Sequence, residues 1–135
     1  MDDPGKAPLL GTIDEYLAWL HKFRSKKKWD KQHTYVIDII KVLHGRKFYI
    51  TKAALDDSVL EKRRADGEPI PPSFIATTQN ILNNYTSQSE VFRKAGKGPE
   101  DDLFYSPQGK GSGTWALHQE RAQQWLKRKV GETQI

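Results

Sequence analysis

The stretch SFIATTQNILNNY, residues 73–85, carries the two patterns that decide the expected fold. Side chains suited to a buried helix face recur at helical spacing, and these are Phe74, Thr78, Ile81, Leu82 and Tyr85. Hydroxyl and amide side chains occupy the other positions, namely Thr77, Gln79, Asn80, Asn83 and Asn84. Ser73 is placed to cap the first turn. We therefore expect a helix that is apolar behind and rich in amides in front.

Two further helices are predicted near the N-terminus. Thr12 and Glu15 have the spacing of a capping box. The apolar face that follows consists of Ile13, Tyr16, Leu17, Leu20 and Phe23. A second helix, hydrophobic enough to be central, is expected to end near Gly45. Its apolar face consists of Val36, Ile39, Ile40 and Leu43.

A third helix is predicted directly before the stretch at residues 73–85. Residues 46–50 favour a brief strand, after which Thr51 is expected to cap a helix that continues to about Ala65. The buried stripe of this helix consists of Leu55, Val59 and Leu60. Three prolines in residues 66–72 exclude a continuous helix there, because proline lacks an amide donor. These residues are expected to form a loop.

A hairpin and a last helix are predicted after residue 100. Residues 102–105 and 114–117 favour strands, and the segment 106–113 bridges them. Within that segment Gly109, Gly111 and Gly113 permit positive φ and a close approach to a phosphate, although a simple turn needs the same glycines. Residues 119–130 have helix-forming composition and end on cations, which suit the negative end of a helix dipole.

Three helices followed by a two-stranded hairpin are the element order of a winged helix-turn-helix. We therefore expect an α+β protein, a winged helix-turn-helix with additional N-terminal and C-terminal helices. The expected divisions are a flexible N-terminal arm at 1–11, an N-terminal helix and basic linker at 12–33, the winged-helix domain at 34–118, and a C-terminal helix and tail at 119–135.

The sequence also resembles a known family over about residues 35–118. The segments PSFIAT (72–77), DLF (102–104) and GKGSGTWAL (109–117), together with Ile81, Leu82 and Tyr85, resemble winged-helix domains found beside nuclease domains in bacterial restriction systems. The resemblance implies binding to double-stranded DNA in a restriction or defence system, with a nuclease domain or subunit as a further partner. It also implies, as a narrower expectation, recognition of a modified base such as N6-methyladenine.

Composition favours a polyanionic partner and limits the cellular compartments in which the protein is expected. Lys and Arg outnumber Asp and Glu by 22 to 17, a formal charge of +5, which suits a nucleic acid but also occurs in ordinary basic proteins. The chain has no cysteine, so disulfides and thiolate zinc sites are excluded. No apolar run approaches a membrane span, and the N-terminus is acidic where a signal peptide is basic. We expect a soluble cytoplasmic protein with no membrane partner.

Two groups of residues are predicted to contact DNA. Amide and hydroxyl side chains suit base edges, and the candidates for base reading are Thr77, Gln79, Asn80, Asn83 and Asn84. The candidates for phosphate binding are Lys26, Lys27, Lys28, Arg93, Lys97 and Lys110. The alternatives are that the amides merely cover an exposed helix surface and that the basic run is a solvated linker. If a modified base is bound, Trp115 and Tyr105 are the candidates for an aromatic cage, although a core role for Trp115 is the stronger alternative.

The sequence offers little for catalysis. The four histidines are scattered without metal-ligand spacing, and the acidic run 100–102 is expected to be a solvated loop. The hairpin tip lacks the Gly-Lys-Ser/Thr of a phosphate-binding loop. We expect no catalytic residues, no metal and no cofactor. The rival hypotheses are a protein interaction module, for which exposed aromatics such as Trp19 are suited, and a remote nuclease.

Overall fold

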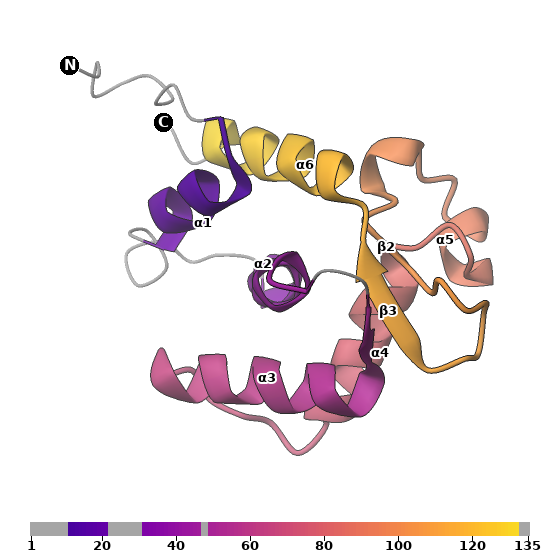
Figure 1. Ribbon diagram of the computed structural model, residues 1–135, viewed down its shortest axis with the longest axis horizontal. Coiled ribbons are helices and arrows are strands. Elements are labelled where there is room, and N and C mark those ends of the chain that lie inside the picture. The colour runs from indigo at the N-terminus through magenta and orange to yellow at the C-terminus, as the bar shows by residue number, and fades with distance from the viewer. Residues whose placement is uncertain (1–10, 22–30, 47–48, 133–135) are drawn as a thin grey trace.

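The structure is a computed structural model that describes residues 11–21, 31–46 and 49–132. These residues form an α+β fold of helices around a small antiparallel sheet (Figure 1). In chain order the elements are α1 (Ile13–His21), α2 (Lys31–His44), β1 (Ile50–Thr51), α3 (Lys52–Ala65), α4 (Phe74–Asn84), α5 (Glu90–Lys94), the 3-10 turn η1 (Pro99–Asp101), β2 (Phe104–Tyr105), β3 (Thr114–Leu117) and α6 (Gln119–Glu132).

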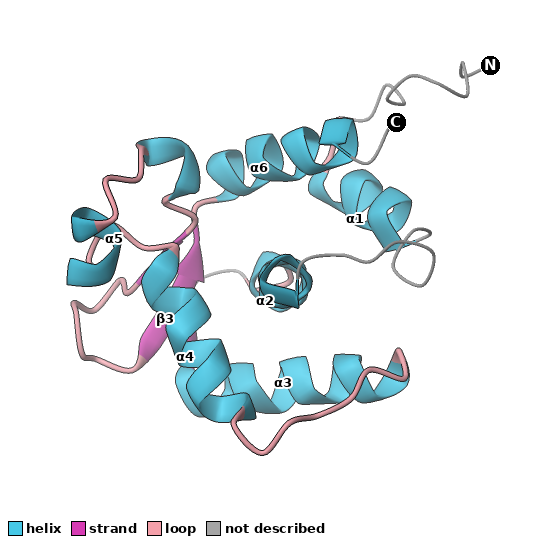
Figure 2. Ribbon diagram, turned by 180° about the vertical axis from the view of Figure 1, so that it is seen from behind, coloured by secondary structure: helices cyan, strands magenta, loops and turns pink. Residues whose placement is uncertain are grey.

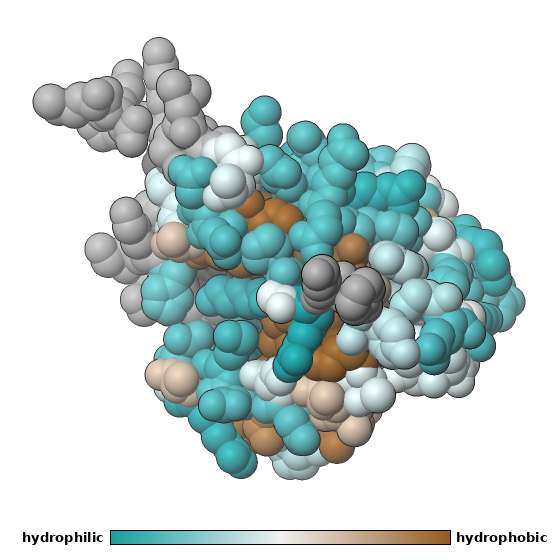
Figure 3. Space-filling model, in the orientation of Figure 1, coloured by the Kyte–Doolittle hydropathy of each residue, from teal (hydrophilic) through white to brown (hydrophobic). Residues whose placement is uncertain are grey.

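Helix α2 lies in the middle of the molecule, as its hydrophobicity predicted. Figures 1 and 2 show it end-on, with α3 on one side and α1 and α6 on the other. Its buried residues surround the helix axis: Thr34, Tyr35, Val36, Ile37, Asp38, Ile39, Ile40, Val42 and Leu43. On the face drawn in Figure 3, hydrophilic residues cover most of α3 and α6, and apolar residues show mainly between them, beside α2.

The sheet has the strand order β1-β3-β2, and both pairings are antiparallel. Ile50 pairs with Trp115 in the first ladder, and Phe104 pairs with Leu117 in the second. Because paired residues point to the same face of a sheet, these four side chains share one face. All four are buried in the hydrophobic core, so this face of the sheet packs on the helices.

The two outer helices pack against each other and against α2. Half of the predicted capping box forms at α1, since the Glu15 amide donates to Thr12 Oγ1 at 3.1 Å, whereas the Glu15 carboxylate accepts from the Thr12 hydroxyl at 3.0 Å and from the Gly11 amide at 3.4 Å. His44 at the end of α2 reaches both neighbours, at 3.3 Å from Asp14 Oδ1 on α1 and at 3.0 Å from Gln119 Oε1 on α6. The N-terminal and C-terminal additions are therefore integral parts of the described core.

Several local predictions are corrected by the structure. Helix α4 begins after Ser73 but that side chain makes no capping bond, because Ser73 lies near helical backbone angles (ψ 16°) where a capping residue is extended. The first strand is Ile50–Thr51, later than the predicted 46–50. Helix α5 and the turn η1 occupy a segment predicted as a connection. Trp19 is half-buried against the core and is not an exposed aromatic.

Some predictions lie outside the described residues, among them the N-terminal arm up to residue 10, Phe23 and the basic run of the linker. Within the described ranges, no helix combines the length and the apolar composition needed to cross a membrane.

Candidate nucleic-acid interface

Helix α4 has one buried and one solvent-facing side, as its sequence predicted. Phe74, Thr78, Ile81 and Leu82 are buried. Of the predicted base-reading residues Asn80 is exposed, and the others are half-buried. The amide-bearing side of α4 is therefore accessible to a ligand.

The buried side of α4 is tied to the start of α3 by a polar network. Thr78 Oγ1 donates to Asp56 Oδ1 at 2.7 Å. The Lys52 ammonium lies 2.5 Å from Asp56 Oδ2 and 3.0 Å from Thr78 Oγ1. Asp56 is buried, and a buried charge is tolerated when it is paired and hydrogen-bonded. The network fixes how α4 lies relative to α3.

The hairpin loop, residues 106–113, leaves the sheet beside α4. Its glycines adopt the predicted positive φ, at 102° for Gly109, 83° for Gly111 and 76° for Gly113. At one end the Lys52 amide donates to the Gly113 carbonyl at 2.8 Å. At the other end the Gln88 side chain forms two hydrogen bonds with the Ser106 backbone. Both ends of the loop are therefore held, and its tip is exposed.

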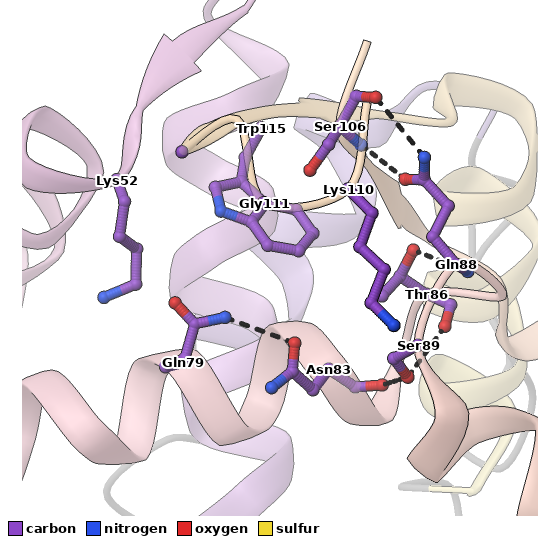
Figure 4. A pocket seen from close by; sticks show the side chains of 11 residues that line it. Lys52, Gln79, Asn83, Thr86, Gln88, Ser89, Ser106, Lys110, Gly111 and Trp115 are labelled. Carbon is purple, nitrogen blue, oxygen red and sulfur yellow. Dashed lines mark hydrogen bonds between the residues drawn. The ribbon is translucent and has the colours of Figure 1, made fainter. Parts of the chain in front are cut away.

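A pocket of about 310 Å³ lies between α4 and the hairpin loop. Gln79 and Asn83 line it from α4, Lys110 from the loop, Trp115 from β3 and Lys52 from α3. Figure 4 shows the Trp115 indole on the opposite side of the pocket from Gln79 and Asn83, and the Lys110 side chain running from the loop towards Asn83 and Ser89. The structure thus brings two predicted base-reading residues and one predicted phosphate-binding residue to one site.

The electrostatic character of the pocket is positive. Two lysines line it, and among the described residues that form its walls there is no Asp or Glu. In the described part of the chain the Lys110 ammonium has no hydrogen-bond or ion-pair partner, whereas that of Lys52 is paired with Asp56. Lys110 therefore brings an uncompensated cation to the pocket.

The two amides in the pocket are linked to each other. Gln79 Nε2 donates to Asn83 Oδ1 at 3.2 Å across one helical turn. The bond leaves Gln79 Oε1 as an acceptor and the Asn83 amide nitrogen as a donor. A hydrogen-bonded pair of this kind presents both groups in a fixed order along the helix.

The other predicted contact residues do not line this pocket. Lys97 is occupied structurally, because its ammonium donates to the Asn84 carbonyl at 2.7 Å and lies 4.6 Å from the centre of the Tyr85 ring. Arg93 is exposed on α5. Thr77 and Asn80 lie on other sides of α4. Lys26, Lys27 and Lys28 fall outside the described residues.

The structure does not assemble the predicted aromatic cage. Tyr105 pairs with Ala116 in the sheet, so its side chain points to the face opposite that of Trp115. The Tyr105 ring instead stacks on His118, with ring centres 4.4 Å apart. Of the two residues, only Trp115 lines the pocket.

The acidic run is only partly the solvated loop that was expected: Glu100 is exposed, whereas Asp102 is buried. Its carboxylate accepts hydrogen bonds from the Ser87 amide and hydroxyl, both at 2.8 Å, and from Arg121 at 2.7 Å. It also lies 3.9 Å from His118 Nε2. Burial lowers the pKa of His118, and Arg121 lowers it further, while Asp102 acts in the opposite direction. Asp102 therefore links its own segment to Ser87, which precedes α5, and to Arg121 on α6.

The chemistry of a metal centre is not evident in the described residues, where no three His, Asp or Glu side chains are grouped to hold an ion. Comparison with known proteins finds no match to this chain among protein families, characterised proteins or solved structures. The site must therefore be interpreted from its own geometry.

Proposed function

We propose that this chain binds double-stranded DNA as a winged helix-turn-helix module. In this proposal α4 enters the major groove and the hairpin loop forms the wing on the neighbouring backbone. The element order supports it, because α2, α3 and α4 precede a hairpin whose strand β3 also pairs with β1. The absence of carboxylates from the pocket walls, noted above for the described residues, suits a polyanion.

The observation that carries the proposal is the pocket between α4 and the loop. It places base-compatible amides, Gln79 and Asn83, next to the cation of Lys110, which has no partner among the residues that the structure describes. Base edges and backbone phosphates lie within one groove width of each other in duplex DNA, so a DNA-binding surface needs both kinds of group side by side. A helix surface with no ligand would not be expected to combine base-compatible amides and a cation in one pocket.

A titration of the chain with duplex DNA at several salt concentrations tests this function. We expect log K to fall linearly with log salt. Lys110→Ala should weaken binding to every duplex alike and reduce that slope by about 0.9, whereas Asn83→Ala should reduce discrimination between sequences. Lys127→Ala is the matched control, because Lys127 is exposed on α6, whose C-terminal half lies far from the hairpin loop in Figures 1 and 2.

The narrower parts of the proposal concern the modification and the partner. A nuclease domain or subunit would complete a restriction or defence system, and N6-methyladenine would be the base recognised. Titrations with methylated and unmethylated duplexes of the same sequence test the second point. Equal affinities would show that the methyl group is not recognised and would leave duplex binding itself intact.

A protein interaction module is the second candidate function. It is favoured by two large apolar side chains that are more than half exposed, Ile75 at 67% on α4 and Val91 at 54% on α5. Complete lack of duplex binding at low salt would exclude the DNA function and favour this one.

A further inference from the structure

A strip of three side chains runs along one line of α4. Ile75, Gln79 and Asn83 are spaced by four residues, and residues four apart are neighbours on a helix surface. Gln79 and Asn83 line the pocket described above, and Ile75 precedes them by one turn. The proposed DNA-binding function uses Lys110 for affinity but does not say which atoms of this strip contact which base.

The hydrogen bond between Gln79 and Asn83 fixes which groups remain for a ligand. Gln79 donates through Nε2 and Asn83 accepts through Oδ1. The acceptor Gln79 Oε1 and the donor Asn83 Nδ2 have no other partner among the described residues. The pair therefore keeps Gln79 Oε1 as an acceptor and Asn83 Nδ2 as a donor, together with the second N–H of Gln79 Nε2 and the second lone pair of Asn83 Oδ1.

Among the four bases, adenine has the matching major-groove edge. Its N6 amino group donates and its N7 accepts, so it pairs with an acceptor next to a donor. Guanine presents two acceptors, O6 and N7. At guanine, Gln79 Oε1 would meet the acceptor O6, and a hydrogen bond could form there only through the second N–H of Gln79 Nε2. The contact between Gln79 Oε1 and N6 is therefore the one that favours adenine over guanine.

Ile75 supplies an apolar contact beside the amide pair. Its side chain is 67% exposed, the most exposed of the large apolar side chains in the described part of the chain. Its carbonyl accepts from the Lys52 ammonium at 3.4 Å, which ties the first turn of α4 to α3. The major groove contains one apolar group that distinguishes a base, the thymine C5-methyl. Ile75 is thus suited to a thymine next to the adenine.

We propose that the strip gives this chain a preference for adenine and thymine. In this arrangement Gln79 Oε1 accepts from adenine N6, Asn83 Nδ2 donates to adenine N7, and Ile75 packs on the methyl group of a thymine in a neighbouring pair. The inference rests on the proposed DNA-binding function and specifies the sequence class that α4 recognises.

Selection from a pool of duplexes with a randomised centre tests the preference, using the full chain. We expect wild-type protein to enrich duplexes with an adenine at one position and a thymine nearby. Gln79→Leu and Asn83→Leu should lose the adenine and keep the thymine, and Ile75→Ala should do the reverse. Gln124→Leu on α6 is the matched control and should select the wild-type motif. Circular dichroism confirms that each variant is folded.

Base analogues in the selected duplex then test the individual contacts. Replacing adenine by 7-deazaadenine removes N7 and should weaken wild-type binding at least about fivefold, with no effect on Asn83→Leu. Replacing thymine by deoxyuridine removes the methyl group and should affect wild type but not Ile75→Ala.

The outcomes distinguish failure of this inference from failure of the proposed DNA-binding function. A duplex motif without adenine, or an adenine that all three variants retain, would overturn the inference and leave DNA binding intact. Failure of the wild-type chain to bind any duplex at low salt would overturn the proposed function and this inference together.

Discussion

Gln88 and Ser106 form a two-point clamp between the start of the α5 region and the start of the hairpin loop. The Ser106 amide donates to Gln88 Oε1 at 2.6 Å, and Gln88 Nε2 donates to the Ser106 carbonyl at 3.4 Å (Figure 4). The Gln88 side-chain amide thus pairs with both backbone groups of Ser106, as the backbone of a neighbouring strand would. The hairpin loop that carries Lys110 is positioned by a residue outside the hairpin.

We predict that Gln88→Ala loosens the hairpin loop and lowers stability. The Ser106 amide would lose its partner in a largely buried position, and such a loss costs about 1–3 kcal/mol. Urea unfolding measures the change in the free energy of unfolding, and Gln124→Ala on the exposed surface of α6 is the control. If the loop carries a DNA contact, duplex affinity should fall in Gln88→Ala and not in the control. An unchanged urea midpoint would show that the clamp adds nothing to the stability of the fold.

Two glycine substitutions should change the stability of the protein in opposite directions. Gly113 has a φ of 76° and its carbonyl accepts the Lys52 amide, so Gly113→Ala forces a side chain into the left-handed region at about 1–2 kcal/mol. Gly131 lies in α6 with nothing within 4 Å of an added Cβ, so Gly131→Ala should stabilise by about 0.5 kcal/mol. Thermal unfolding of both variants measures the two effects, and a Gly113→Ala variant as stable as wild type would contradict the assignment of strain to Gly113.

The helix faces were predictable from the sequence because periodic burial leaves a periodic pattern. Phe74, Thr78, Ile81 and Leu82 were assigned to the buried side of α4, and all four are buried. The strand 114–117 was predicted from its composition and from the glycine-rich segment before it, and not from a period, because all four of its residues are buried. Helix α5 was missed because its five residues are too few to show a period.

The contacts that build the pocket could not be predicted, because each joins residues far apart in the chain. Lys52 and Thr78 are separated by 26 residues, and Gln88 and Ser106 by 18. Composition and periodicity do not specify such pairs. The aromatic cage failed for a related reason: which strand residues share a face depends on the register of the hairpin, and the register sets Trp115 against Ile50 and Tyr105 against Ala116.

We predict that the core tolerates replacement of both Asp38 and Arg63 better than replacement of Arg63 alone. Asp38 Oδ2 lies 2.9 Å from Arg63 Nη1, and both side chains are almost completely buried. Arg63→Met leaves the Asp38 charge buried without this partner, which should cost about 3–5 kcal/mol. The double variant Asp38→Leu/Arg63→Met should recover most of that loss. Denaturant unfolding of wild type, both variants and the exposed control Arg64→Met measures the coupling, and additive losses would contradict it.

His118 should make the stability of the protein depend on pH. Burial lowers its pKa below the ordinary value of 6.5, Arg121 lowers it further, and Asp102 only partly opposes them. Between that lowered pKa and 6.5 the unfolded chain binds more protons at this residue than the folded chain does, so stability rises with pH. The free energy of unfolding should therefore decrease as the pH falls from about 7.5 through 6.5 towards the lower folded pKa. His118→Gln removes this contribution, and the difference between wild type and variant should shrink steadily over the same interval. Parallel stability curves for the two proteins would contradict a lowered pKa at His118.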